Sequence, residues 1–315
     1  MSKKRMVAWL LAVCLLTSLL TACSVRHWEQ TAEADGETSG MLFWEVSDAD
    51  GNLLYLLGAI HVGEDSLYPL PKAVREAYAA ADLLAVEVDL IAMEKNLALM
   101  AELSQMLMYT DGTTLADHLP ADLYEETRMT MAELGYAAET IELLHPSVWT
   151  SVLDTAAAEA CGLSGDDGVD RYLLEKAHAD GKEIYELESA KQQYEMLVGL
   201  SDEISAMLLR SSLRDRETQT EALETMYEIY RSGDFAAFSA YISEDPVDLT
   251  AEEQLLYAEY VKALIDDRNV GMIAQALELL ASGDVGLFVV GAAHMVGANG
   301  LIAALEAAGC TVEQK

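Results

Sequence analysis

Two short segments near opposite ends of the chain share one pattern, and this pattern limits the folds that the chain can adopt. Each is an apolar run of strand type, then a glycine, two small or apolar residues and a histidine: residues 53–61 read LLYLLGAIH and residues 287–294 read LFVVGAAH. A strand that ends in glycine can turn sharply because no Cβ blocks the turn, so the histidine can point across the end of a sheet. For both histidines to serve one site, the fold must bring the first and last strands together.

The remaining strand and helix signals predict the architecture around these segments. Apolar runs bounded by turn residues predict strands at residues 43–46, 53–57, 83–86, 183–187, 285–290 and 311–312. An Asp-Gly turn within residues 48–52 is typical of a hairpin. Helical patterns dominate the middle of the chain. We therefore expect an α/β (α+β) fold, with a mixed central sheet built from N- and C-terminal strands and a large helical insertion.

The amino terminus has the form of a bacterial secretory signal. Three basic residues precede an apolar run that ends in LTAC, whose cysteine is Cys23. This ending resembles a lipobox, so we expect residues 1–22 to be a lipoprotein signal peptide and Cys23 to be lipidated. Residues 23–40 then form the lipidated cysteine and a flexible tether, and residues 41–315 form the domain. The alternative is an ordinary signal peptide in which Cys23 is incidental; the lipidated form predicts a protein anchored to the extracytoplasmic face of the cell membrane.

Charge and cysteine content restrict the partners. The formal net charge of −35 repels nucleic acid, so we expect no nucleic-acid partner and a membrane contact made through the lipid. Cys161 and Cys310 have no metal-type cysteine neighbour, and outside the cytosol they are able to pair. Whether they do is left open by the sequence.

Four polar residues directly follow expected strands: His61, Glu87, Glu188 and His294. In open α/β sheets the ligand crevice lies beyond the carboxyl ends of the strands, so we expect these side chains to share one site. Two histidines and one or two carboxylates suffice to hold a catalytic divalent ion with a position left for water. Each residue alone has a structural explanation, such as a capped histidine or a glutamate at a helix N-terminus.

Further motifs occur in a fixed order over residues 42–313. They are LGAIHV at 57–62 with YPLP at 68–71, EVD at 87–89, GVD at 168–170, LE at 187–188 with Gln193, DRN at 267–269, and VGAAH at 290–294 with Gly297 and the GL pair at 300–301. Together these motifs resemble the TraB/GumN family, to which the Tiki-type membrane-tethered metalloproteases are related. The resemblance implies a core like that of erythromycin esterase and ChaN-type proteins.

The same resemblance implies roles for individual residues. His61 and His294 are expected as metal ligands or catalytic histidines, and Glu87 as a ligand or base. Glu188 and Arg268 are expected as further catalytic residues, Glu188 moving protons and Arg268 stabilising charge. An ion pair with a nearby acid is the structural alternative for Arg268.

Two more residues of the matched motifs, Asp170 and Asn269, are expected to bind substrate; a helix cap is the structural alternative for Asn269. We therefore expect an extracytoplasmic lipoprotein hydrolase, a peptidase that uses zinc, manganese or cobalt on a peptide or protein substrate. Two alternatives stay open: a metal-independent, esterase-like hydrolase with the same residues, and a TraB-like protein that sequesters a peptide signal without cleaving it.

Overall fold

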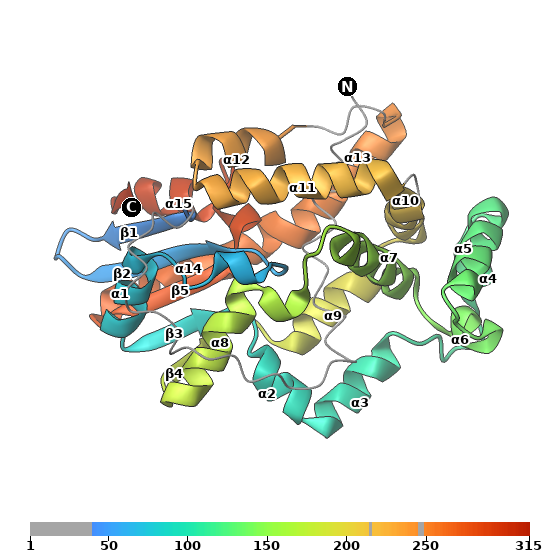
Figure 1. The fold of residues 1–315 in the computed structure, drawn as a ribbon, viewed down its shortest axis with the longest axis horizontal. Helices are drawn as coiled ribbons and strands as arrows, with labels where there is room; N and C mark the ends of the chain where they lie inside the picture. Colours follow the sequence, from blue (N-terminus) through green and yellow to red (C-terminus); the bar gives the residue numbers. More distant parts are fainter. Residues whose placement is uncertain (1–39, 214–215, 245–248) are drawn as a thin grey trace.

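The computed structural model describes residues 40–213, 216–244 and 249–315 (Figure 1). The signal peptide, Cys23 and all of the tether except Gly40 lie outside the described residues, so these sequence expectations stay predictions. Within the described ranges, no helix combines the length and apolar character needed to span a bilayer.

A six-stranded mixed sheet forms the centre of the fold, with the strand order β4-β3-β5-β2-β1-β6. The strands are β1 (Phe43–Ser47), β2 (Leu53–Ala59), β3 (Leu83–Val86), β4 (Glu183–Glu186), β5 (Gly286–Gly291) and β6 (Thr311–Gln314). Strands β2, β5, β3 and β4 run parallel, whereas β1 is antiparallel to both β2 and β6. The α/β class and the mixed sheet expected from the sequence are confirmed, and so is the hairpin, in which Gly51 has a φ of +86°.

Helices supply most of the remaining chain. They are α1 (Lys72–Ala80), α2 (Leu90–Lys95), α3 (Leu97–Met106), α4 (Leu115–His118), α5 (Ala121–Glu133), α6 (Ala138–Leu143), α7 (Pro146–Ala160), α8 (Val169–Asp180), α9 (Ala190–Val198), α10 (Asp202–Leu213), α11 (Arg216–Ser232), α12 (Phe235–Ile242), α13 (Ala251–Val261), α14 (Asp267–Ser282) and α15 (Leu301–Ala307), with short turns η2 (Asp65–Leu67), η3 (Gly165–Asp167) and η5 (Ala292–Met295). A π-helical turn, η4 (Lys262–Asp266), joins α13 directly to α14. Helix α8 ends where Gly181 adopts the left-handed conformation, as the sequence indicates.

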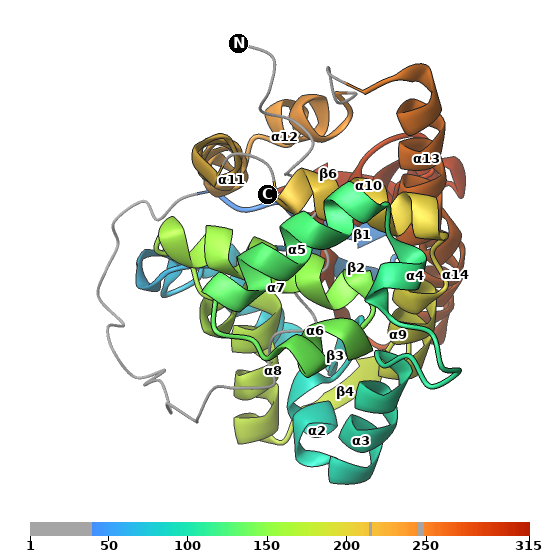
Figure 2. The same cartoon turned by 90° about the vertical axis from the view of Figure 1, so that its right-hand side faces the viewer.

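The main core surrounds the sheet and extends into the inserted helices α10 and α11. Helix α14 packs on β2 and β5, α8 packs on β3, and the strand side chains Leu54, Leu57 and Phe288 are completely buried in this main core. A second core around the buried Trp149 joins α7 and α10 to the outlying helices α4, α5 and α6. These outlying helices stand beyond α7 at the right of Figure 1 and lie in front of the sheet in Figure 2. The open carboxyl ends of the parallel strands are therefore covered by inserted helices.

The two cysteines of the described domain do not pair. Cys161 follows helix α7, Cys310 lies between α15 and β6, and both are free thiols. Burial raises the pKa of Cys161 to about 11, so this thiol is protonated at neutral pH. The structure therefore answers the question that the sequence left open in favour of two separate thiols.

Asp154 is a buried acid inside the helical insertion. Its Oδ1 accepts a hydrogen bond of 2.9 Å from the Ser212 hydroxyl of α10, and its Oδ2 is buried with no partner among the described residues. Burial raises the pKa of Asp154 to about 7, although the Ser212 hydrogen bond opposes this shift. The folded chain therefore favours the protonated carboxyl, and ionisation here costs stability.

This burial predicts a pH-dependent effect of Asp154→Asn. The pKa in the folded chain lies above the value of about 3.9 for an unfolded chain, so the folded state binds more protons between these values and stability falls as the pH rises. We expect Asp154→Asn to raise the free energy of unfolding by roughly 1–3 kcal/mol at about pH 8, and to change it little at about pH 4. Urea unfolding at both pH values measures this.

Asp122→Asn is the matched control, because it removes an exposed carboxylate that pairs with Arg210. This variant should gain no stability at the higher pH. Equal effects of Asp154→Asn at both pH values would contradict the assignment.

Candidate functional site

The carboxyl ends of the parallel strands meet at one edge of the sheet. In the β2–β5 pair Ala59 lies opposite Gly291, and in the β3–β5 pair Val86 lies opposite Val289. The backbone beyond β3 and β4 continues this alignment, because the Glu188 N–H donates to the Glu87 carbonyl at 3.0 Å. All four strand-end residues expected from the sequence therefore reach the same edge.

Gly291 lies where three of these side chains converge. A Cβ at this position would lie 3.4 Å from Glu87 Oε1, 3.4 Å from His61 Nε2 and 3.6 Å from His294 Cδ2. The Gly291 N–H donates to Glu87 Oε1 at 2.7 Å, and this oxygen lies 3.8 Å from His294 Nε2. A cavity of about 10 Å³ lies between His61, Glu87, Asp170 and Gly291, which is room for about one water molecule.

His61 is oriented by Asp170, the second residue of helix α8. Gly168 allows this approach, since a Cβ there would lie only 2.7 Å from the His61 carbonyl oxygen. The Val169 N–H then donates to the Ile60 carbonyl at 2.9 Å, and Asp170 Oδ2 lies 2.9 Å from His61 Nδ1. Burial alone would lower the pKa of His61, but the Asp170 carboxylate outweighs it and raises the pKa to about 9.

His294 is oriented by Asn269, which lies near the start of helix α14. Asn269 Oδ1 lies 2.7 Å from His294 Nδ1, and Asn269 Nδ2 donates to the carbonyls of His294 and Asn299 at 3.3 and 2.9 Å. Burial lowers the pKa of His294 to about 3, so this imidazole is neutral at neutral pH. Asn269 is only 1% exposed and thus acts as a support for the ring.

Arg268 joins the two strand-end glutamates. Its Nε donates to both carboxylate oxygens of Glu188 at 3.0 Å, and its guanidinium also pairs closely with Glu87 Oε2. Gln193 Nε2 donates to Glu87 at 3.2 Å and to Glu188 at 3.0 Å. Burial alone would raise the pKa of Glu87, but the Arg268 guanidinium holds it well below its usual range. Glu87 is therefore an ionised carboxylate inside the fold.

The structure thus brings together every expected site residue within the described part of the chain, while their chemical roles stay predictions. It also assigns contacts that the sequence did not indicate. Asp170 and Asn269, which we expected to bind substrate, each contact one imidazole, and Gln193 bridges the carboxylates. The sequence signal for these contacts is weak, because it consists only of polar residues near the N-termini of α8, α9 and α14.

The donor types fit a divalent ion. Each histidine has its Nδ1 next to a side-chain oxygen, so its Nε2 is the nitrogen left for another partner, as is usual for histidines that bind metals. Imidazole nitrogens and a carboxylate are ligands that zinc and similar ions accept. In the part of the chain that the structure describes, however, no set of three or more His, Cys, Asp or Glu side chains is already arranged to hold an ion.

The chain is thus an α/β protein with a mixed sheet and a buried, charged polar centre. This centre contains two imidazoles, two carboxylates and a guanidinium at the carboxyl ends of the parallel strands. The sequence profile of the TraB/PrgY/gumN family matches residues 42–314, so the chain belongs to this family. The resemblance inferred from the ordered motifs is thereby confirmed.

Two curated relatives are similar to part of the chain. They are "Uncharacterized protein YbaP" of Escherichia coli strain K12 and the protein of the same name from Shigella flexneri, each 26% identical over 172 residues. The match spans 55% of this chain and 61% of each relative, which is less than two thirds of their length. No solved structure matches, so the likeness to the erythromycin esterase and ChaN-type core stays a prediction.

The buried charges predict a large effect of removing Arg268. Arg268→Met leaves Glu87 and Glu188 without their shared cation, so we expect the free energy of unfolding to fall by about 3–5 kcal/mol at neutral pH. Converting both glutamates to glutamine in the same chain should recover part of this loss. Urea unfolding of the three proteins measures both effects.

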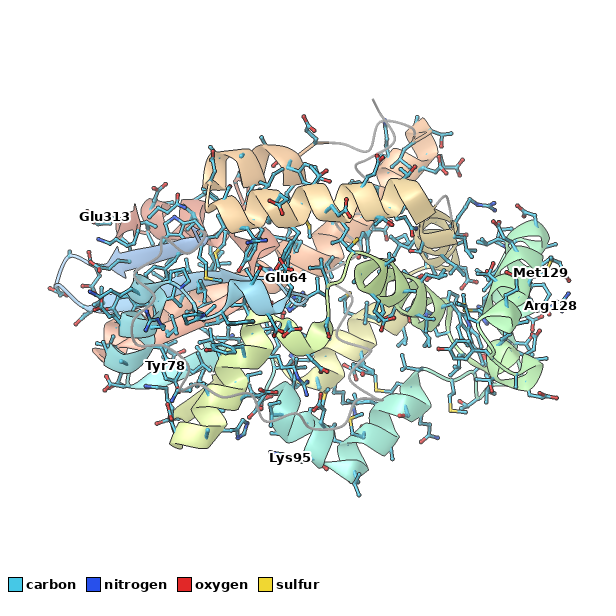
Figure 3. All side chains as sticks on the ribbon, viewed as in Figure 1. Glu64, Tyr78, Lys95, Arg128, Met129 and Glu313 are labelled. Carbon is cyan, nitrogen blue, oxygen red and sulfur yellow. The ribbon has the colours of Figure 1, made fainter. Side chains whose placement is uncertain are left out.

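Arg128→Met is the matched control. Arg128 is exposed on helix α5, far from the sheet in Figure 3, and pairs only with its neighbour Glu125 among the described residues. Its loss should cost less than about 1 kcal/mol. A cost as small as this for Arg268→Met would show that the buried ion pair is not important for stability.

Proposed function

We propose that this chain is an extracytoplasmic, lipid-anchored hydrolase that cleaves peptide bonds with the help of a divalent metal ion. The observation that carries the proposal is the convergence of His61, Glu87 and His294 on Gly291, with both histidines oriented through Nδ1. Hydrolysis requires a held water, a proton acceptor and a stabiliser of negative charge, and this edge of the sheet supplies side chains of each type.

In this proposal His61, His294 and Glu87 would hold the ion. When bound, a divalent ion lowers the pKa of water toward ~7 and polarises a carbonyl group. Asp170 and Asn269 fix the two imidazoles so that Nε2 of each faces the centre. Arg268 keeps Glu87 ionised and holds both Glu87 and Glu188 in place by hydrogen bonds. The inserted helices limit the cavity to about one water, which excludes bulk solvent.

A metal-free hydrolase that uses the same side chains is the second candidate. The observation that favours it is that both oxygens of Glu87 already have partners: Oε1 accepts from the Gly291 N–H, while Oε2 contacts Arg268 and Gln193. A carboxylate held in this way serves as a fixed negative charge beside the histidines. In this reading one of the two histidines would act as the general base, and Arg268 would stabilise the developing charge.

A cleavage assay on the full chain purified in detergent tests these readings. We expect a peptide library to be cleaved, the activity to fall after chelation and to return with zinc, manganese or cobalt, and His61→Ala to lower the rate at least about 100-fold. Mass spectrometry of the products and metal analysis of the protein give the two measurements.

His178→Ala is the control, because His178 pairs with Asp89 and does not contact the site. Its rate should stay near that of the wild type. Cleavage that survives chelation would favour the metal-free hydrolase, whereas tight peptide binding without products would favour sequestration of a peptide signal.

Lipid anchoring is tested separately at Cys23. We expect the wild type to incorporate radiolabelled palmitate and to sediment with membranes, because acyl chains supply the membrane affinity that an acidic surface lacks. Cys23→Ser should abolish the label, with Cys310→Ser as a control that leaves it unchanged. Equal labelling of the wild type and Cys23→Ser would reject the lipoprotein assignment.

A further inference from the structure

A second, larger cavity lies beside the buried centre. It measures about 510 Å³, within the range of about 300–1,000 Å³ typical of ligand sites, and it lies between α12, α13, the π-helical turn and the loop after η5. Its apolar wall includes the buried side chains of Tyr257, Ile265 and Val296. The cavity of about 10 Å³ next to Glu87 is too small for more than a water, so any larger ligand must be held elsewhere.

The larger cavity is adjacent to the site through two short segments of chain. Val296 follows His294 by two residues and Asp266 precedes Arg268 by two, so the Cα atoms of each pair lie within about 7.6 Å of each other. Asn299 also lines the cavity, and its carbonyl accepts the hydrogen bond of 2.9 Å from Asn269, the residue that orients His294. A ligand in this cavity therefore touches the loop directly after η5, which carries His294, and the π-helical turn directly before α14, which carries Arg268.

The polar lining of the cavity is acidic. Glu244 and Asp266 contribute carboxylates, and among the described residues that line the cavity there is no lysine, arginine or histidine. The Asp266 side chain makes no capping hydrogen bond to α14, and Lys262 of the same turn is bound to Asp267 instead. The cavity thus combines an apolar wall with a carboxylate that is available to a cation, and the formal net charge of −35 attracts cations to the surface.

From this geometry we infer that the cavity holds the part of the substrate that flanks the reacting bond, and that it selects peptides with a cationic residue next to an apolar one. Asp266 binds the cation, and Tyr257, Ile265 and Val296 pack on the apolar side chain. This inference rests on the proposed function for the identity of the ligand as a peptide, and it deepens that function by naming the substrate class.

Binding of matched peptides tests the inference without requiring turnover. The full chain carrying His61→Ala is titrated in detergent with fluorescent peptides that differ at one position, lysine or methionine, beside a leucine, and anisotropy reports the affinity. We expect the lysine peptide to bind about five-fold more tightly or better at low salt. Asp266→Asn should remove this preference and leave the methionine peptide unaffected, and Asp266→Lys should shift the preference to a glutamate peptide.

Glu259→Gln is the control, because Glu259 is an exposed carboxylate of helix α13 that lies outside the cavity lining. It should keep the lysine preference. Equal affinity for the lysine and methionine peptides, equal losses in Asp266→Asn and Glu259→Gln, or no binding of any peptide would overturn the inference. If the wild type binds the lysine peptide selectively but cleaves no peptide, the inferred role of the cavity is supported and the peptidase proposal is rejected. If the wild type cleaves peptides without a preference for lysine, the peptidase proposal is supported and the inferred role of the cavity is rejected.

Discussion

The parallel alignment of β2, β5 and β3 is the constraint on which the rest of the structure depends. Because Ala59 lies opposite Gly291, the turns that follow β2 and β5 begin at the same level, and Glu87 follows β3, the neighbour of β5 on its other side. Backbone hydrogen bonds between strands far apart in the sequence therefore fix the distance between the imidazoles. A shift of one residue in the β2–β5 pairing would turn one histidine away from the other. The glycines of both turns are needed for the same reason: Gly58 approaches Ala292 closely, and Gly291 leaves the space that the three side chains share.

The buried centre also depends on a balance between positively and negatively charged side chains. Glu87 is buried beside a second carboxylate, and the Arg268 guanidinium, which contacts both, holds the pKa of Glu87 well below its usual range. The histidines differ in their surroundings: His61 lies against a carboxylate and is easily protonated, whereas His294 lies against a neutral amide and is not. The two imidazoles of one centre therefore differ in their tendency to hold a proton, because their Nδ1 partners differ in charge.

Much of the fold and most residues of the site could be predicted from the sequence. Strands β1, β2, β3 and β5 are short, largely buried runs bounded by turns, and the largely exposed edge strands β4 and β6 were predicted as well. The sheet-edge rule placed His61, Glu87, Glu188 and His294 together. The supports of the histidines were not predictable, because Asp170 and Asn269 come from helix N-termini whose position depends on tertiary packing. Likewise, the helical periodicity of the insertion predicts helices, but it does not predict how these helices pack on one another. The burial of Asp154 and the cavity beside Val296 both depend on that packing, so neither could be predicted from the sequence.

Helix α14 carries Arg268 and Asn269 at adjacent positions, and these point about 100° apart around the helix axis. Arg268 contacts the two carboxylates and Asn269 contacts His294. The carboxylates and His294 are therefore both positioned by one helix, which packs on β2 and β5. A tilt of helix α14 would displace Arg268 and Asn269 at the same time. The π-helical turn directly before α14 determines how the helix is rotated about its axis. Inserting or deleting a residue in that turn would therefore displace Arg268 and Asn269 together, although none of the polar side chains of the site had been changed.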